Sequence, residues 1–346
     1  MYVTPRPDPI EDPLYGIRLG LMGALAYLAI PILNPALPPI IAALPVGLIA
    51  SQRRAFDPGK AIGGVVAMIV LPWIMTWFVE WLRPMPLVYV GAMWLVYFSG
   101  FLLILRSGAQ AGMLIVVVAV LMSVMGMHGN ATVEFLRDGF VQASLVALVV
   151  GPLVYLLLPP RTREKQVDDP KPGGGNTTLG AAIRATVLLG LSFWLYAVMQ
   201  PSDMMMAVVA AMVLVFPTRN AVFHEARQRV RATFYGGAIA VGVLALFTLS
   251  PNLPILLGLI FLSGLWLGQK MLNGTRPSMV YQYAFSVALA LIAGALSTQD
   301  PAYATFTRIV LTLTGAFVAA FTVALLDAMT GWRRSAEHEA QGVTGT

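Results

Sequence analysis

The 346-residue chain contains no cysteine and few charged residues: Asp, Glu, Lys and Arg make up 11% of it, while 58% of its residues are hydrophobic. A soluble domain carries about a quarter charged residues, so this composition excludes an ordinary soluble protein and indicates a membrane protein. The absence of cysteine excludes disulfides, thiolate chemistry and cysteine metal sites. The three histidines are scattered along the chain, so no metal site is predicted.

Signals of an enzyme or of a cofactor site are also missing. The glycine-spaced run GLWLGQK (264–270) lacks the spacing of a phosphate-binding loop and the Ser or Thr that follows it. No nucleophile–base pair or pair of acids stands out as one site, so we expect no enzyme and no cofactor. The net charge of +6 comes from basic residues in short loops, which excludes a nucleic-acid-binding face.

Long apolar runs fill the chain and predict an all-α integral membrane protein. A helix of about 20 apolar residues crosses a membrane. Twelve helices are predicted, near residues 17–33, 36–50, 61–82, 86–105, 110–127, 134–158, 179–199, 203–217, 232–249, 253–270, 279–297 and 304–329. The runs at 36–50 and 203–217 are short, and both are candidates for broken or re-entrant segments.

Basic residues lie almost entirely on one side of the predicted helices. With the N-terminus inside, only Arg83, Arg137 and Arg308 of the 22 Lys and Arg residues fall outside. The positive-inside rule therefore predicts that both termini are cytoplasmic. The polar, proline-rich N-terminus lacks the pattern of a cleaved signal, so we expect it to be retained, with the first helix as an uncleaved signal.

The two halves of the chain resemble each other. Arg18 recurs as Arg184 at an offset of 166 positions, and LRDGFVQASLVAL in the first half corresponds to FTRIVLTLTGAFV in the second. Because six crossings restore the orientation, the two six-helix repeats should be parallel, related by a pseudo-two-fold axis along the membrane normal. The predicted segments are an N-terminal tail (1–16), two repeats (17–160 and 178–331) joined by a cytoplasmic linker (161–177), and a C-terminal tail (332–346).

Arg137 and Arg308 begin the last helix of each half and lie on helix faces made of small and polar residues. The face of Arg308 includes Thr312 and Gly315, and that of Arg137 includes Ser144. Such a stripe either packs closely against another helix or lines an aqueous path. If the halves meet there, the paired guanidinium groups favour an anion, above all a carboxylate. The alternative is that each arginine reaches the lipid headgroups and anchors its helix end.

The proline-interrupted segment IPILNPALPPIIAALP and its counterpart VMQPSDMMMAVVAAM occupy matching places in the two halves. Interrupted helices at matching positions are typical of transport sites. Asn34, Ser202 and Asp203 would supply the polar lining, although Asn-Pro and Pro-Ser-Asp are also ordinary turn sequences.

Proton coupling would need an acid within the membrane, and the candidates are Glu134, Asp138, Asp203 and Asp327. Glu134 and Asp138 also suit the start of a helix, where acids interact favourably with the helix dipole. We interpret Arg18 and Arg184, which lie near the cytoplasmic face, as anchors of their helices.

The chain resembles the fusaric-acid-resistance (FUSC) and aromatic acid exporter superfamily of bacterial inner-membrane proteins. The resemblance rests on the six-helix duplication and on helices that open with R-x-x-x-T-x-x-G, as in RVRATFYGGAIA (229–240) and RIVLTLTGAFVAA (308–320). The large cytoplasmic domain of longer members is missing between the halves, so the chain resembles a short, membrane-only member.

The resemblance implies efflux of aromatic carboxylates or related toxic organic anions, often with a periplasmic membrane-fusion adaptor as partner. Because no nucleotide site is visible in the sequence, we expect the proton-motive force to supply the energy. It also implies relatedness to plant malate channels, which supports Arg137 and Arg308 as a central pair. A homo-oligomer in membrane lipid is compatible with this picture. Two other functions stay open: a passive organic-anion channel with the same arginine pair, and a non-transporting membrane scaffold.

Overall fold

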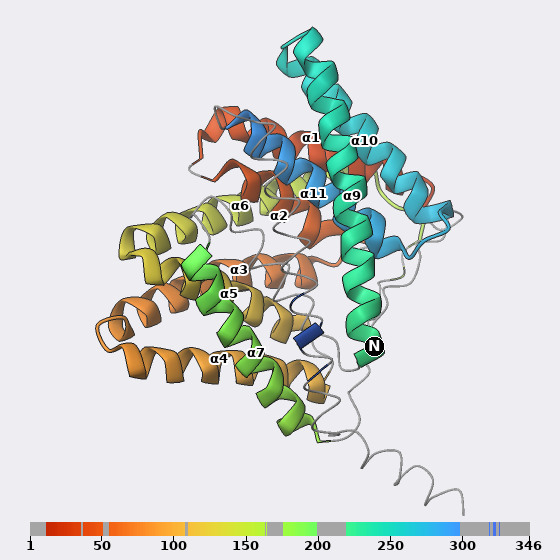
Figure 1. Ribbon diagram of the computed structural model, residues 1–346. Coiled ribbons are helices and arrows are strands. Elements are labelled where there is room, and N and C mark those ends of the chain that lie inside the picture. The colour runs from red at the N-terminus through yellow and green to blue at the C-terminus, as the bar shows by residue number, and fades with distance from the viewer. Residues whose placement is uncertain are drawn as a thin grey trace, which may run out of the picture.

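A computed structural model describes residues 12–35, 37–50, 55–107, 110–162, 164, 176–198, 219–297, 318, 321, 322 and 325. Every regular element in these residues is an α-helix (Figure 1). The helices are α1 (Tyr15–Leu33), α2 (Pro38–Ala50), α3 (Pro58–Leu82), α4 (Pro86–Ser107), α5 (Gln110–His128), α6 (Asn130–Leu157), α7 (Thr177–Val198), α9 (Arg219–Leu249), α10 (Leu253–Asn273) and α11 (Ser278–Leu296).

The predicted all-α membrane class is confirmed for the described ranges. Nine helices there are long and apolar enough to cross a membrane, each close to a predicted one. The predicted helix at 203–217 lies outside the described residues, as does the one at 304–329 except for four separate helical positions. The arrangement of twelve helices in two repeats therefore stays a prediction.

Several helices begin earlier than the apolar pattern predicts, and α3 and α9 show why. Asp57 caps α3 by accepting a hydrogen bond from the Gly59 amide, and Pro58 fits the first helical turn. Helix α9 begins at Arg219, where we predicted a cytoplasmic loop up to residue 231. Its first turns contain several Ala and Arg residues, one Glu and one Gln. All four residue types favour a helix, and the charged ones lower the hydropathy. A hydropathy pattern therefore misses such a segment.

Helix α2 is short, as the short apolar run at 36–50 predicts. Its 13 residues span about 20 Å, which is less than the roughly 30 Å hydrocarbon thickness of a bilayer. It packs against α1, α6 and α11, and Ile41, Ala42 and Val46 are completely buried. Other helices therefore cover the short helix. A segment that crosses a membrane incompletely is tolerated where protein surrounds it.

Helices from the two halves pack against each other at several places, and two of these crossings form a matching pair. The first helix of one half packs against the fourth helix of the other, as α1 against α10 and as α7 against α4 (Figure 1). At the first crossing, a Cβ placed on Gly264 would lie 2.6 Å from the Cα of Gly20, so the two backbones nearly touch. At the second, the Trp94 indole donates to Thr186 Oγ1 at 3.0 Å. The first crossing is glycine-lined and close, and the second carries bulky side chains.

The buried apolar residues form two cores. One lies among α3, α4, α5, the start of α6, and α7, and the other among α1, α2, the end of α6, α9, α10 and α11. The first core encloses a polar cluster in which the Tyr97 hydroxyl bonds to the hydroxyls of Ser123 and Ser192. Helix α6 contributes to both cores and connects them.

Candidate anion-binding site

The stripe of α6 that contains Arg137 and Ser144 also includes Leu148 and Gly151, and it contacts α3 at two places. The Arg137 guanidinium lies over the Trp73 ring of α3, 4.1 Å from its centroid, and its Nε donates to Asp138 Oδ1 at 2.9 Å. Near the other end of α6, Leu148 and Gly151 line a cleft together with α3. In the described residues both ends of this stripe therefore contact a helix of its own half, and an aqueous path along it stays a prediction.

Arg137 is mostly covered, whereas the acids beside it are not. The Arg137 side chain is 16% exposed and that of Asp138 57%, and Glu134 is also exposed. The predicted partner Arg308 lies outside the described residues, and so do Thr312, Gly315, Ser202, Asp203 and Asp327. The convergence of Arg137 and Arg308 on one anion therefore stays a prediction.

Two further predicted residues, Asn34 and Ser144, lie in the described part. Asn34 ends α1 in the left-handed conformation, with φ at 43°, and its amide donates to the Ile30 carbonyl at 2.9 Å. Its side chain is exposed, so its visible role is to turn the chain from α1 toward α2. Ser144 is fully buried, and its hydroxyl has no hydrogen-bond partner within the described part of the chain.

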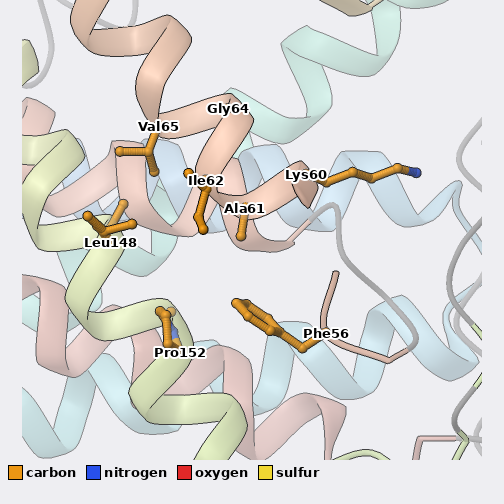
Figure 2. Close-up of a pocket in the computed structure, with 10 residues that line it drawn as sticks. Phe56, Lys60, Ala61, Ile62, Gly64, Val65, Leu148 and Pro152 are labelled. Atoms are coloured by element: carbon orange, nitrogen blue, oxygen red, sulfur yellow. The ribbon is translucent and has the colours of Figure 1, made fainter. Parts of the chain in front are cut away.

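A small cleft separates the start of α3 from the last turns of α6. Figure 2 shows it between Ile62, Ala61 and Val65 of α3, Leu148 and Pro152 of α6, and Phe56, which precedes α3. Its volume is about 110 Å³ and its lining is almost entirely apolar. The Lys60 side chain also borders it and extends away from it (Figure 2).

A buried ion pair lies beside this cleft. Arg18 of α1 pairs with Asp12, and its Nη1 donates to the Leu158 carbonyl at the end of α6 at 3.3 Å. The guanidinium carbon lies 4.4 Å from the ring centroid of Tyr155, and that ring lies 5.1 Å from the ring of Phe56. Arg18 is therefore connected to the cleft through two aromatic rings.

Both members of the ion pair are removed from solvent. The Arg18 side chain is 2% exposed and that of Asp12 1%. Burial raises the pKa of the Asp12 carboxyl, and the neighbouring Arg18 charge opposes the rise. The second carboxylate oxygen, Oδ1, is buried and has no hydrogen-bond partner among the described residues. The carboxylate is therefore held by the guanidinium at only one of its two oxygens.

The interpretation of Arg18 and Arg184 as headgroup anchors is wrong. Arg184 is completely buried, like Arg18, and its Nη1 donates to the Gly180 carbonyl at 3.1 Å. An anchor has to reach lipid headgroups, and neither side chain does so in the described bundle. The acid six residues before Arg18 was the available signal in the sequence, because a buried arginine needs a partner.

The described residues contain no group of three or more His, Asp or Glu side chains that could hold a metal ion. What they offer is a set of cations inside an apolar bundle: Arg18, Arg184 and Arg229 are all buried, and the Arg229 guanidinium lies over the Tyr283 ring. Groups of this kind bind carboxylates and other anions.

No curated protein and no solved structure matches the chain. The model of one family, described as fusaric acid resistance protein-like, matches residues 191–322. This range covers most of the predicted second repeat and includes both R-x-x-x-T-x-x-G segments. The match confirms the resemblance that these segments indicate, and it supports membership of the chain in the FUSC family.

Proposed function

We propose that the chain is a bacterial inner-membrane efflux transporter for small organic anions, aromatic carboxylates in particular. The multi-span helical fold and the family match both fit a membrane transporter. The proton-motive force is the proposed energy source, and a periplasmic membrane-fusion adaptor is the proposed partner. Both termini would be cytoplasmic, in agreement with the distribution of basic residues.

The observation that carries the proposal is the burial of arginine side chains within an apolar, membrane-spanning bundle. Arg18 and Arg184 are 2% and 0% exposed, although ionised side chains inside a membrane protein are costly. Such residues are retained where they pair with other groups or line the path of a substrate. A path that carries carboxylates would use them, because the guanidinium fork matches a carboxylate.

A passive organic-anion channel is the second candidate, and one observation favours it. Glu134 and Asp138, two of the four acids proposed for proton coupling, are exposed on α6. Neither side chain is therefore enclosed within the described bundle, where a coupling acid is expected. A channel needs no such group, and selectivity could come from charged side chains alone.

Transport of labelled nicotinate by the purified chain in proteoliposomes tests the proposal. Nicotinate is an aromatic carboxylate, and nicotinamide, which has the same ring without the charge, is the matched control. We expect accumulation of nicotinate under an imposed pH gradient and no protein-dependent flux of nicotinamide. Downhill flux alone would indicate a channel. Flux no faster than in protein-free liposomes would contradict both.

Arginine variants test the predicted central pair in the same assay. Removing a charged hydrogen-bonding group costs about 1.5–3 kcal/mol, so Arg137→Ala and Arg308→Ala should each slow nicotinate flux about tenfold or more. Arg106→Ala, at an exposed arginine at the end of α4, should leave the rate unchanged. Wild-type rates in both pair variants would exclude Arg137 and Arg308 from the binding site.

A further inference from the structure

We propose that Arg18 binds the carboxylate of the substrate at the predicted cytoplasmic end of the bundle, and that Asp12 occupies this position when no substrate is bound. The inference rests on the proposed function and deepens it, since it specifies where an aromatic carboxylate enters. It concerns a different place from the predicted Arg137–Arg308 pair, because Arg18 contacts the last turns of α6 whereas Arg137 lies near the first.

The surroundings of Arg18 suit an aromatic acid. One edge of the guanidinium faces a carboxylate, that of Asp12, and its face lies 4.4 Å from the Tyr155 ring centroid. The Leu158 carbonyl accepts a hydrogen bond from Nη1 of the guanidinium at 3.3 Å and helps to hold the guanidinium in place. A cation held between an aromatic face and a carboxylate combines charge-assisted hydrogen bonds with a cation–π contact. The guanidinium could make both kinds of interaction with an aromatic carboxylate.

Asp12 is a replaceable occupant of this position. It belongs to the segment that precedes α1, and within the described residues its backbone carbonyl caps the first turn by accepting from the Tyr15 amide at 3.2 Å. Only Oδ2 reaches the guanidinium, while Oδ1 is buried and no described residue hydrogen-bonds to it. A free carboxylate can turn until both oxygens are bound, and bidentate pairing is the stronger arrangement. A substrate could therefore compete with Asp12.

The cleft between α3 and α6 gives the ring of such a ligand a place. Its volume of about 110 Å³ is smaller than the roughly 150 Å³ apolar cavity that holds a benzene molecule. Phe56 forms one wall of the cleft (Figure 2). Its ring also packs on that of Tyr155, 5.1 Å away between centroids. A rotation of the Phe56 side chain would enlarge the cleft and extend it toward Tyr155 and Arg18. The ring of the ligand would then stack on Tyr155, next to the guanidinium that binds its carboxylate.

The test is equilibrium binding of labelled nicotinate to the full chain in lipid nanodiscs. Asp12→Asn removes the competing charge and leaves Arg18 in place, so the affinity for nicotinate should rise about tenfold, equivalent to about 1.4 kcal/mol. Arg18→Gln should abolish binding in the Asp12→Asn background as well. Nicotinamide should show no gain in either variant, and Arg106→Gln should leave nicotinate binding unchanged.

Two results would overturn the inference: an Asp12→Asn variant that binds nicotinate no more tightly than the wild type, or an Arg18→Gln variant that binds it equally well. If Asp12 and Arg18 only stabilise the fold, Asp12→Asn lowers the unfolding temperature without any gain in affinity. Should Arg18→Gln fail to fold, the Asp12→Asn comparison alone decides.

The same variants in the proteoliposome assay separate this inference from the proposed function. Wild-type nicotinate flux that persists in Arg18→Gln would refute the Arg18 site and leave the transporter standing. Tighter binding in Asp12→Asn without nicotinate flux in any variant would support the site and refute transport of this substrate.

Discussion

The glycine-lined crossing of α1 and α10 allows a prediction with a built-in control. A Cβ added to Gly264 would lie 2.6 Å from the Cα of Gly20 and 2.7 Å from Cζ of Phe285. Carbon atoms prefer a separation of about 3.5–4.0 Å, so Gly264→Ala has to push the two helices roughly 1 Å apart. Overpacking of this kind costs about 1–3 kcal/mol.

Gly258 on the same helix is the matched control, because a Cβ there would meet nothing within 4 Å. In both variants, alanine gains about 0.8–1.0 kcal/mol of helix propensity over glycine. Gly258→Ala should therefore stabilise the protein, and the two variants should differ by the overpacking cost alone. We expect Gly264→Ala to unfold about 1–3 kcal/mol more easily than Gly258→Ala.

Unfolding in mixed micelles with a rising fraction of denaturing detergent, followed by tryptophan fluorescence, measures this difference. The refuting result is equal stability of Gly264→Ala and Gly258→Ala. It would mean that the helices do not approach each other at Gly20 and Gly264, and the close crossing of the two halves would have to be abandoned.

Two further predictions concern the packing and the orientation of the helices. Tyr97→Phe removes the hydroxyl that bonds to Ser123 and Ser192, and both serines keep bonds to backbone carbonyls of their own helices. The variant should therefore lose only about 0.5–1.5 kcal/mol in the same unfolding assay, and a much larger loss would show that the cluster holds α4, α5 and α7 together cooperatively. Because the chain has no cysteine, single cysteines report its orientation directly. In intact spheroplasts, a membrane-impermeant maleimide should label Pro84→Cys and should label Arg161→Cys only after lysis; the reverse pattern would invert the topology.

Sequence pattern alone predicts the helices of this fold well, since each crossing depends on a local run of apolar residues. The start of α9 shows the limit of that approach. Residues 219–231 form a helix through backbone propensity, which a hydrophobic pattern does not register. The short length of α2 was predictable from the short apolar run at 36–50. Its burial among α1, α6 and α11 was not.

The candidate site was less predictable, because burial depends on partners that lie far apart in the chain. Arg18 contacts the Leu158 carbonyl, 140 positions away, and the ring of Tyr155. No local periodicity encodes such a pairing, and Arg18 therefore resembled a helix anchor. In the same way, the pattern on α6 identified a stripe of small and polar residues around Arg137 but not that it faces Trp73 of α3.

Movement of an organic anion by this chain is the central claim, and flux of nicotinate through the purified wild-type protein tests it most directly. Liposomes of the same lipids without protein supply the background. The account predicts protein-dependent nicotinate flux that saturates with concentration and is absent for nicotinamide. Nicotinate flux equal to the protein-free background, from a protein shown to be folded in the membrane, would contradict it.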